Sequence, residues 1–336
     1  MRRTPTVSFA NFICRFGDRL TLLDLATEVV LPAFLDPSLT RKYGPSRYFL
    51  YQMKRRVLPA SSTNELPTLI LYGRFVKDTV LTRSQIFTQE QGLVEQEASI
   101  ASAPSSFFVL ILNNHKLIYL PETADAPSLD TFASTVHGFL RTKHRLYIDR
   151  LYQNLKGSDA PPTKKHLYEE YPPPDVEVLP LASKTSIDNF VDTFDTLTQL
   201  EFRILDTNQE LQMQETYQRL REMKDSIGSK KTKLIHSNSA GLDKTQAKEQ
   251  IHASAATGNQ EVKLTGTASD RTRVSGDNQH FKLQVPLGDI ADDPFERARQ
   301  LVETYRRQIE QGTLAEDTAQ DFEEKLQSLL ERLNEQ

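Results

Sequence analysis

The stretch that decides the fold is residues 106–120, which read SFFVLILNNHKLIYL. Two apolar runs, 106–112 and 116–120, flank the segment Asn113-Asn114-His115. Asparagine tolerates the left-handed backbone of tight turns, so the stretch predicts a β-hairpin. The first run is apolar on both faces, which is typical of a central strand. We therefore expect this hairpin to lie in the middle of an antiparallel sheet.

More strands and one helix are predicted before this hairpin. Residues 7–15 and 69–75 have strand patterns, and 77–87 predicts a second strand or a bend. Apolar residues recur at helical spacing over 20–30, and Pro32 is expected to end that helix.

A long helix is predicted after the hairpin, over residues 128–156. Its apolar residues step by three and four, which is typical of a helix packed on one side. Prolines at 161–162 and 172–174 then indicate an extended linker. We predict an N-terminal α+β domain over 1–156, with a mostly antiparallel sheet and this helix, and a linker over 157–174.

The second half alternates predicted strands and helices, which indicates an α+β sandwich over 175–290. Strands are predicted at 176–181, 200–205, 232–236, 261–266, 271–276 and 280–287. Helices are predicted at 187–194, 209–227 and 243–258, the second with a capping box of Thr207 and Glu210. The fold class is therefore α+β.

Residues 291–336 predict an acidic helical hairpin. Asp293-Pro294 followed by Glu296 is a typical helix start. From Leu287 to the end there are 13 acidic residues against 6 Lys and Arg. The last helix repeats apolar residues at 4-3-4 spacing, which we interpret as core rather than as a partner face: Phe322, Leu326, Leu329 and Leu333.

Composition limits the classes of function. The 336 residues carry a formal net charge of −4, which excludes a general polycation but leaves room for local basic surfaces. The single cysteine, Cys14, makes no intramolecular disulfide and fits a reducing compartment. No apolar run reaches the length of a membrane helix, and no secretory signal is evident, so we expect a cytoplasmic protein with no membrane partner.

Catalytic motifs are missing. The sequence has no phosphate-binding loop, dinucleotide fingerprint, zinc-protease motif or nucleophile elbow. We therefore assign no catalytic residue, metal ligand or cofactor, and we expect a protein without enzymatic activity.

Two acidic groups keep a metal-dependent nuclease open as an alternative. Asp188, Asp192 and Asp195 fall on one face of a predicted helix, where they form either a cation site or a solvated face. Asp175, Glu201 and Arg203 resemble the acids and the basic residue that nucleases place on adjacent strands. Strand alternation also places Glu201 and Arg203 on a wet face.

Basic clusters give the strongest functional indication. Residues 1–60 contain ten Lys and Arg against four acids. Ordered Lys and Arg neutralise phosphates, so we predict that they bind nucleic acid, with Lys54-Arg55-Arg56 and the long helix contacting several phosphates if both face one groove. The predicted contacts are Arg41, Lys42, Arg47, Lys54, Arg55, Arg56, Arg141, Lys143, Arg145, Lys244 and Lys248.

The order of elements resembles that of RexA-type phage-exclusion proteins. The similarity lies in Val176–Leu181, a short helix and Leu200–Ile204, and in the strand from Ser105 to Leu110 before Leu117-Ile118-Tyr119. It covers about residues 70–290 and includes no catalytic signature, and the segment from Asp293 departs from it. The resemblance implies a prokaryotic protein of abortive infection that binds DNA without marked sequence specificity.

Three hypotheses follow. The first is a non-enzymatic DNA-binding sensor or accessory protein of antiphage defence, with duplex DNA as its partner. The second is a metal-dependent nuclease of a defence system. The third is a scaffold that recruits a protein partner, or a second copy of itself, through the C-terminal helices. Salt-dependent binding, Mg²⁺-dependent cleavage and a co-purifying partner distinguish them.

Overall fold

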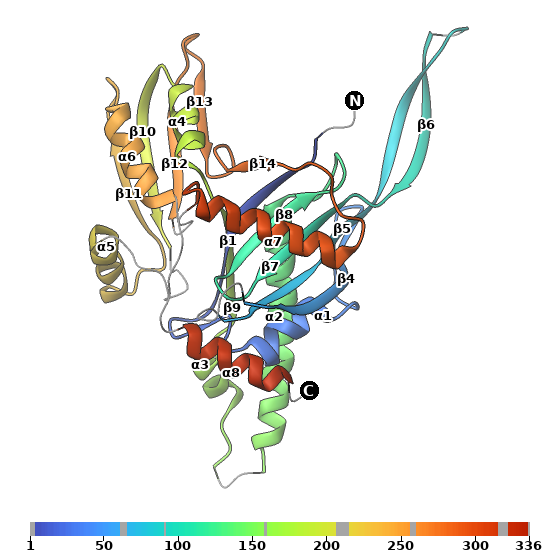
Figure 1. Ribbon diagram of the computed structural model, residues 1–336, viewed down its shortest axis with the longest axis vertical. Helices are drawn as coiled ribbons and strands as arrows, with labels where there is room; N and C mark the ends of the chain where they lie inside the picture. The colour runs from blue at the N-terminus through green and yellow to red at the C-terminus, as the bar shows by residue number, and fades with distance from the viewer. Residues whose placement is uncertain are drawn as a thin grey trace.

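The computed structural model of this chain describes residues 4–60, 66–90, 92–157, 160–205, 215–255, 260–314 and 322–334. The fold is α+β, as the sequence predicts, and combines antiparallel sheets with packed helices (Figure 1). The strands are β1 (Thr6–Phe16), β2 (Leu20–Thr21), β3 (Thr40–Tyr43), β4 (Ser46–Leu58), β5 (Thr68–Thr88), β6 (Gly92–Ser102), β7 (Ser105–Ile111), β8 (Lys116–Pro121), β9 (Pro174–Pro180), β10 (Thr196–Ile204), β11 (Thr232–Ser237), β12 (Gln260–Thr267), β13 (Arg273–Asp277) and β14 (Gln284–Pro286). The helices are the π-helical turn η1 (Ala26–Val30), α1 (Leu31–Leu35), α2 (Leu129–Leu155), α3 (Lys164–Glu170), α4 (Lys184–Asp192), α5 (Glu215–Ser226), α6 (Lys244–Ala255), α7 (Pro294–Glu310) and α8 (Phe322–Asn334).

The large sheet has the predicted hairpin at its centre. Its main path runs β14-β1-β8-β7-β5-β4-β3, with every neighbouring pair antiparallel. His115, rather than either asparagine, takes the left-handed conformation in the turn between β7 and β8. Asn113 instead ties the turn to β5, because its side chain accepts from Leu69 N at 2.8 Å and donates to the Pro67 carbonyl. The predicted hairpin is therefore confirmed. Its turn is fixed by the hydrogen bonds of Asn113 to Leu69 and Pro67.

One core joins the large sheet to α1, α2 and α8, and we call this side of the sheet the α2 face. Phe132 of α2 lies at its centre, with its ring 4.8 Å from that of Phe108 and 5.4 Å from that of Phe75. The Ser128 side chain caps α2 by accepting from Thr131 N. The stripe of the last helix is core as predicted, because its described members are buried here: Leu326, Leu329 and Leu333. The side chain of Phe322 lies outside the described part.

A second core lies on the opposite side of the sheet, under α7, and we call this side the α7 face. Tyr72 and Phe107 of the strands meet Leu301 and Tyr305 of α7 there. The predicted helix start is confirmed, because Asp293 Oδ1 accepts from two backbone N–H groups of the first turn. The sheet therefore separates two independent apolar layers.

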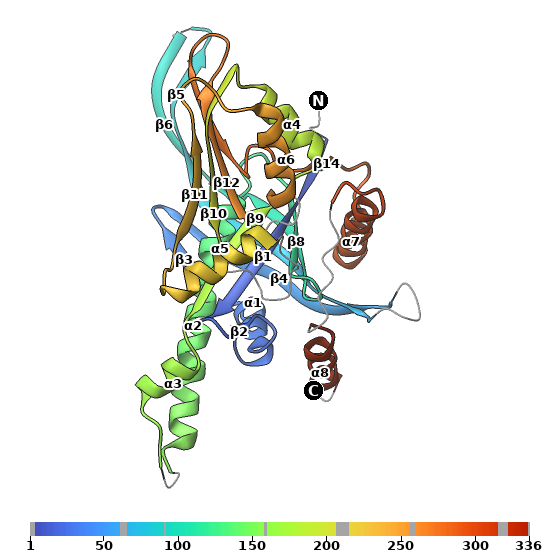
Figure 2. The same ribbon diagram turned by 90° about the vertical axis from the view of Figure 1, so that its left-hand side faces the viewer.

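A smaller sheet, in the order β11-β10-β12-β13, carries α4 and α6 on one face (Figure 2). It contains four of the strands predicted for a sandwich over 175–290. The two other predicted strands, β9 and β14, pair with β1 in the large sheet. The predicted sandwich is thus divided between the two sheets, and separate folding of 1–156 and 175–290 stays a prediction.

The segment 157–174 is less extended than predicted. It contains α3, which begins after the capping residue Thr163 and buries Leu167. His144 of α2 hydrogen-bonds the Tyr171 carbonyl, and His137 hydrogen-bonds the Pro174 carbonyl. These bonds from α2 position the part of the segment that follows α3.

Two other local predictions were wrong, and a third lies outside the described residues. Residues 20–30 form β2, a turn and η1, and Pro32 lies in the first turn of α1, where a missing N–H costs little. The strand predicted at 280–287 extends only over β14, because the chain turns at Asp277–His280. The capping box of Thr207 and Glu210 lies outside the described residues.

β5 is one strand of 21 residues where the sequence predicts two strands or a bend. Its first part lies in the sheet between the two cores. From Thr79 it pairs with β6 alone among the described strands, and the two project from the body as a ribbon (Figure 1). We call residues 79–102 the arm.

Candidate functional site

The basic residues of β3 and β4 divide between the two faces of the large sheet. Arg41 lies opposite Tyr48, which is buried on the α2 face, whereas Lys42 lies opposite Arg47 on the other side. Arg47 Nη2 is 2.8 Å from Asp78 Oδ2, so its charge is paired within the sheet. Of Arg41, Lys42 and Arg47, only Arg41 lies on the α2 face.

The cluster Lys54-Arg55-Arg56 is also split. A β-bulge between Tyr51 and Lys54 precedes it, and Lys54 and Arg56 then lie opposite Tyr72 and Ile70 on the α7 face. Arg55 lies opposite Leu71, which belongs to the α2 face. The cluster therefore does not face one groove together with α2, because strand alternation turns neighbouring side chains to opposite sides.

Basic side chains from distant segments gather on the outer surface of α2. Arg41 Nη1 donates to the hydroxyls of Ser134 and Thr135 on α2. Ser134, Arg141 and Arg145 are separated by seven and four positions, so they share one side of the helix. Arg141 and Arg145 are exposed. We call Arg41, Arg141 and Arg145 the α2 ridge.

Lys143 lies on the same helix, but its ammonium group is paired with an acidic side chain. Its Nζ binds Asp36 Oδ2, at the C-terminal end of α1. This bond from Lys143 lowers the pKa of Asp36 to about 2, with help from Ser38. Lys143 therefore positions α1 on α2 and is a weaker candidate for binding phosphate.

Lys244 and Lys248 of α6 are paired too. Lys248 Nζ is 2.8 Å from Asp192 Oδ1, and Lys244 Nζ donates to the Phe194 carbonyl at 2.7 Å. The Lys248 bond is the largest cause that lowers the pKa of Asp192. Hydrogen-bonded cations next to a carboxylate have little net charge to offer a phosphate.

The acidic side chains of α4 are the partners of side chains on α6. Asp188 Oδ1 lies 2.9 Å from His252 Nε2, and Asp192 faces the two lysines. Within the part of the chain that the structure describes, no three His, Cys, Asp or Glu side chains are grouped as metal ligands. Asp192 acts as a counter-charge for the two lysines of α6, and Asp188 lies beside His252.

The second acidic group is dispersed as well. Glu201 Oε1 is 2.6 Å from Lys233 Nζ on the neighbouring strand. Arg203 instead bridges Glu177 at 2.6 Å and Glu261 at 2.9 Å, which ties β9 of the large sheet to the small sheet. Burial raises the pKa of Glu177, against the effect of Arg203.

A cavity of about 350 Å³ lies where β9 and the small sheet meet. Its charged lining mixes both signs: Arg15, Arg203, Lys230 and Lys231 face Asp18, Asp175 and Glu177. The sequence singled out Asp175 and Arg203 but gave no sign of a cavity, because its lining comes from segments far apart along the chain.

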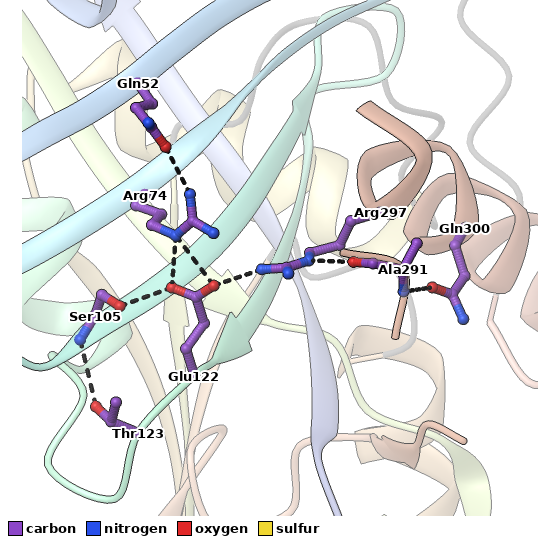
Figure 3. Close-up of polar contacts among 8 residues, drawn as sticks. All are labelled: Gln52, Arg74, Ser105, Glu122, Thr123, Ala291, Arg297 and Gln300. Atoms are coloured by element: carbon purple, nitrogen blue, oxygen red, sulfur yellow. Dashed lines mark hydrogen bonds and ion pairs between the residues drawn. The ribbon is translucent and has the colours of Figure 1, made fainter. Parts of the chain in front are cut away.

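An ionic cluster that the sequence did not predict joins α7 to the large sheet (Figure 3). Arg74 Nε is 3.1 Å from both carboxylate oxygens of Glu122, and Arg297 Nη1 binds Oε1 of the same residue. Both guanidinium groups also lie over the Phe107 ring, 5.8 and 5.1 Å from its centroid. We call Arg74, Glu122 and Arg297 the hub.

The hub also reaches the edge of the sheet. Arg74 Nη1 donates to Gln52 Oε1 at 2.8 Å, and Gln52 has a positive φ of 52° within the bulge of β4 (Figure 3). Opposite the bulge, a Cβ on Gly73 would lie 2.4 Å from Met53 Sδ, so the close packing needs glycine. The hub therefore fixes the path of β4 just before Lys54.

Comparisons with known proteins place the chain in no family: no family model and no curated protein matches it. The relation to RexA-type proteins stays a prediction from the sequence. Among the described residues, no helix is both long and apolar enough to cross a membrane.

Proposed function

We propose that this protein binds the phosphate backbone of duplex DNA, without sequence specificity and without catalysis, through the α2 ridge. The observation that carries the proposal is that Arg41, from a strand about a hundred residues away, joins Arg141 and Arg145 on one exposed side of α2. When cations held on ordered elements neutralise phosphates, the counterions condensed on the DNA are released, and this release supplies sequence-independent affinity.

The ridge presents its cations on a fixed support. Arg141 and Arg145 are spaced about 6 Å along the helix axis. α2 lies against the sheet along its apolar side and bonds the 163–174 segment through His137 and His144. In the proposal these side chains contact phosphates, which position a protein on DNA, whereas specificity needs contacts with base edges.

Both alternatives have less support than DNA binding. The acidic residues on α4 and Glu201 are engaged by His252, Lys248 and Lys233. The scaffold hypothesis, as stated from the sequence, used the C-terminal helices, whose apolar sides are buried within the chain.

The biological setting of the proposal is a cytoplasmic sensor or accessory protein in prokaryotic antiphage defence. This part rests on the similarity of Val176–Ile204 and Ser105–Tyr119 to RexA-type proteins, and on the single cysteine. Binding of any duplex regardless of sequence suits a sensor of invading DNA, because such DNA carries no fixed site.

The test is a salt titration of the protein with two duplexes of unrelated sequence. We expect equal affinities, with a slope of log affinity against log salt of about −2.7 for three phosphate contacts. Incubation with Mg²⁺ is expected to leave both duplexes intact. Absence of binding at low salt, a strong preference for one duplex, or cleavage would contradict the proposal.

A further inference from the structure

The arm exposes large apolar side chains in cross-strand pairs. Leu81 lies opposite Ile100, and Phe87 lies opposite Leu93. Phe87 and Leu93 are 73% and 74% exposed, and Ile100 is 64% exposed. A two-stranded ribbon is marginally stable by itself, and grouped exposed apolar residues mark interaction sites. The arm therefore has the character of a surface that another strand or chain covers.

The charge of the arm is negative. Residues 79–102 contain Glu90, Glu95 and Glu97 against one basic residue, Arg83. Glu95 and Glu97 lie on β6, whose outer edge has no partner among the described strands. Two residues of β6, 96 and 97, oppose Ser84 alone, and this bulge turns Glu95 and Glu97 to opposite faces of the ribbon.

A second unpaired edge in the molecule has the opposite charge. β3 covers β4 only from Ser46 to Phe49, so residues 54–58 form an outer edge in the described sheet. This edge, which we call the β4 edge, contains Lys54, Arg55 and Arg56 and no acid. Val57 beside them is 46% exposed. The hub holds the bulge just before it, so the β4 edge is rigidly presented (Figure 3).

The arm and the β4 edge complement each other. The β6 strand of the arm and the β4 edge each carry charge of one sign on both faces, because Glu95 and Glu97 point to opposite faces, Lys54 and Arg56 face α7, and Arg55 faces α2. Two β4 edges repel each other, as do two arms, since like charges would lie side by side. We propose that the arm of one copy of this chain adds as a strand to the β4 edge of a second copy, with Glu95 and Glu97 beside Lys54, Arg55 and Arg56.

One copy cannot make this contact with itself. Glu95 is paired with Gln85 and Arg56 with Ile70. These positions on β5 are fifteen residues apart, which is on the order of 50 Å along a strand. The contact joins two different surfaces, so it either repeats reciprocally in a two-fold dimer or continues from copy to copy as a ring or an open filament. It leaves the α2 ridge free and does not depend on DNA binding.

The first test is the mass of the full-length protein in solution by light scattering after gel filtration. We expect at least twice the chain mass of 38.3 kDa. Glu95→Lys with Glu97→Lys, or Lys54→Glu with Arg56→Glu, is expected to give the single-chain mass. All four changes in one chain restore the attraction and the assembly. The matched control is Glu169→Lys with Glu170→Lys, on the exposed surface of α3, which leaves the assembly unchanged.

The second test is disulfide cross-linking, which does not depend on reversed charges being tolerated. Cys14 is buried and the chain has no other cysteine, so it does not compete. A tagged Glu95→Cys protein mixed with an untagged Arg56→Cys protein is expected to form a mixed disulfide dimer, and Glu169→Cys with Arg56→Cys is expected to form none. A single-chain mass for the parent protein, an assembly that survives both charge reversals, or absence of the mixed disulfide would overturn the proposal.

Discussion

The α2 ridge and the β4 edge are both basic, yet they differ in every other respect. The ridge lies on a helix surface, and Arg41 joins it from a distant strand. The β4 edge is an unpaired strand with cations on both sides, and the same chain carries an acidic strand that matches it. We therefore propose that similar charge on different backbone supports serves different partners: phosphates for the ridge, and a strand for the edge.

The separation of these two surfaces depends on the sheet between them, so loss of core packing is expected to have the largest effect. Phe132 is buried and its ring contacts those of Phe75, Phe108 and Tyr119. Phe132→Ala should reduce the free energy of unfolding by about 3–5 kcal/mol, measured by urea denaturation. Phe132→Leu fills more of the site and should cost clearly less. Equal losses for the two variants would show that the volume of the side chain at position 132 does not determine the stability.

The hub is expected to have the next largest effect. Glu122→Ala leaves Arg74 and Arg297 without their shared carboxylate while both stay mostly buried. The loss should be about 3 kcal/mol, at the low end for broken buried pairs because the three side chains keep some exposure. Arg299→Ala on the exposed side of α7, which breaks surface pairs with Glu296 and Glu303, should cost less than about 1 kcal/mol. If the two variants lose the same stability, α7 is not held by the hub.

A smaller effect is expected at Asp36, through its pKa. Its pKa is lowered in the folded state to about 2, so its pair with Lys143 contributes stability above the ordinary carboxylate pKa. That contribution disappears as the pH falls through about 2, and solvent screening limits it to about 1 kcal/mol. When stability is measured as a function of pH, the Asp36→Asn variant should lack the loss of stability that the parent protein shows as the pH falls through about 2.

The Asp36→Asn substitution also tests whether Lys143 contributes to DNA binding by the α2 ridge. Asp36→Asn releases Lys143, which lies between Arg141 and Arg145 in the sequence of α2. If Lys143 then reaches DNA, the salt slope should steepen by at most about 0.9. An unchanged slope would place Lys143 outside the reach of the phosphates.

The smallest effect is expected at the paired lysines of α6. Lys244→Ala with Lys248→Ala removes cations that bind Asp192 and the Phe194 carbonyl. We expect an unchanged salt slope in DNA binding and a loss of stability below about 1 kcal/mol. A flatter slope would return these residues to the nucleic-acid interface predicted from the sequence.

Much of the architecture could be predicted from sequence, because local patterns determine it. The hairpin of 106–120, the helix that begins after Ser128 and the start at Asp293 depend on alternation, spacing and capping within a few residues. The pairing of β9 and β14 with β1 could not be predicted, since it depends on contacts across more than a hundred residues. The arm was missed because nothing in the pattern of residues 77–87 shows where β5 leaves the sheet, and no strand was predicted over 92–102.

The candidate site was less predictable than the fold. Sequence proximity grouped Lys54, Arg55 and Arg56, but strand alternation divides them. Arg41 and α2 were both predicted to be basic surfaces, yet their meeting at Ser134 is a tertiary contact. The hub gave no signal, because Arg74, Glu122 and Arg297 come from three separate segments and each is an ordinary charged residue in its own strand or helix.

The most direct test of the central claim compares salt titrations of duplex binding for two double variants, Arg141→Ala with Arg145→Ala and Lys54→Ala with Arg56→Ala. If the α2 ridge binds phosphates, the first variant should flatten the slope by about 1.8 and weaken binding to all duplexes alike. The second should keep the slope and affinity of the parent protein. The reverse outcome, with the β4 edge variant losing slope and the ridge variant behaving as the parent, would contradict the assignment of DNA to α2.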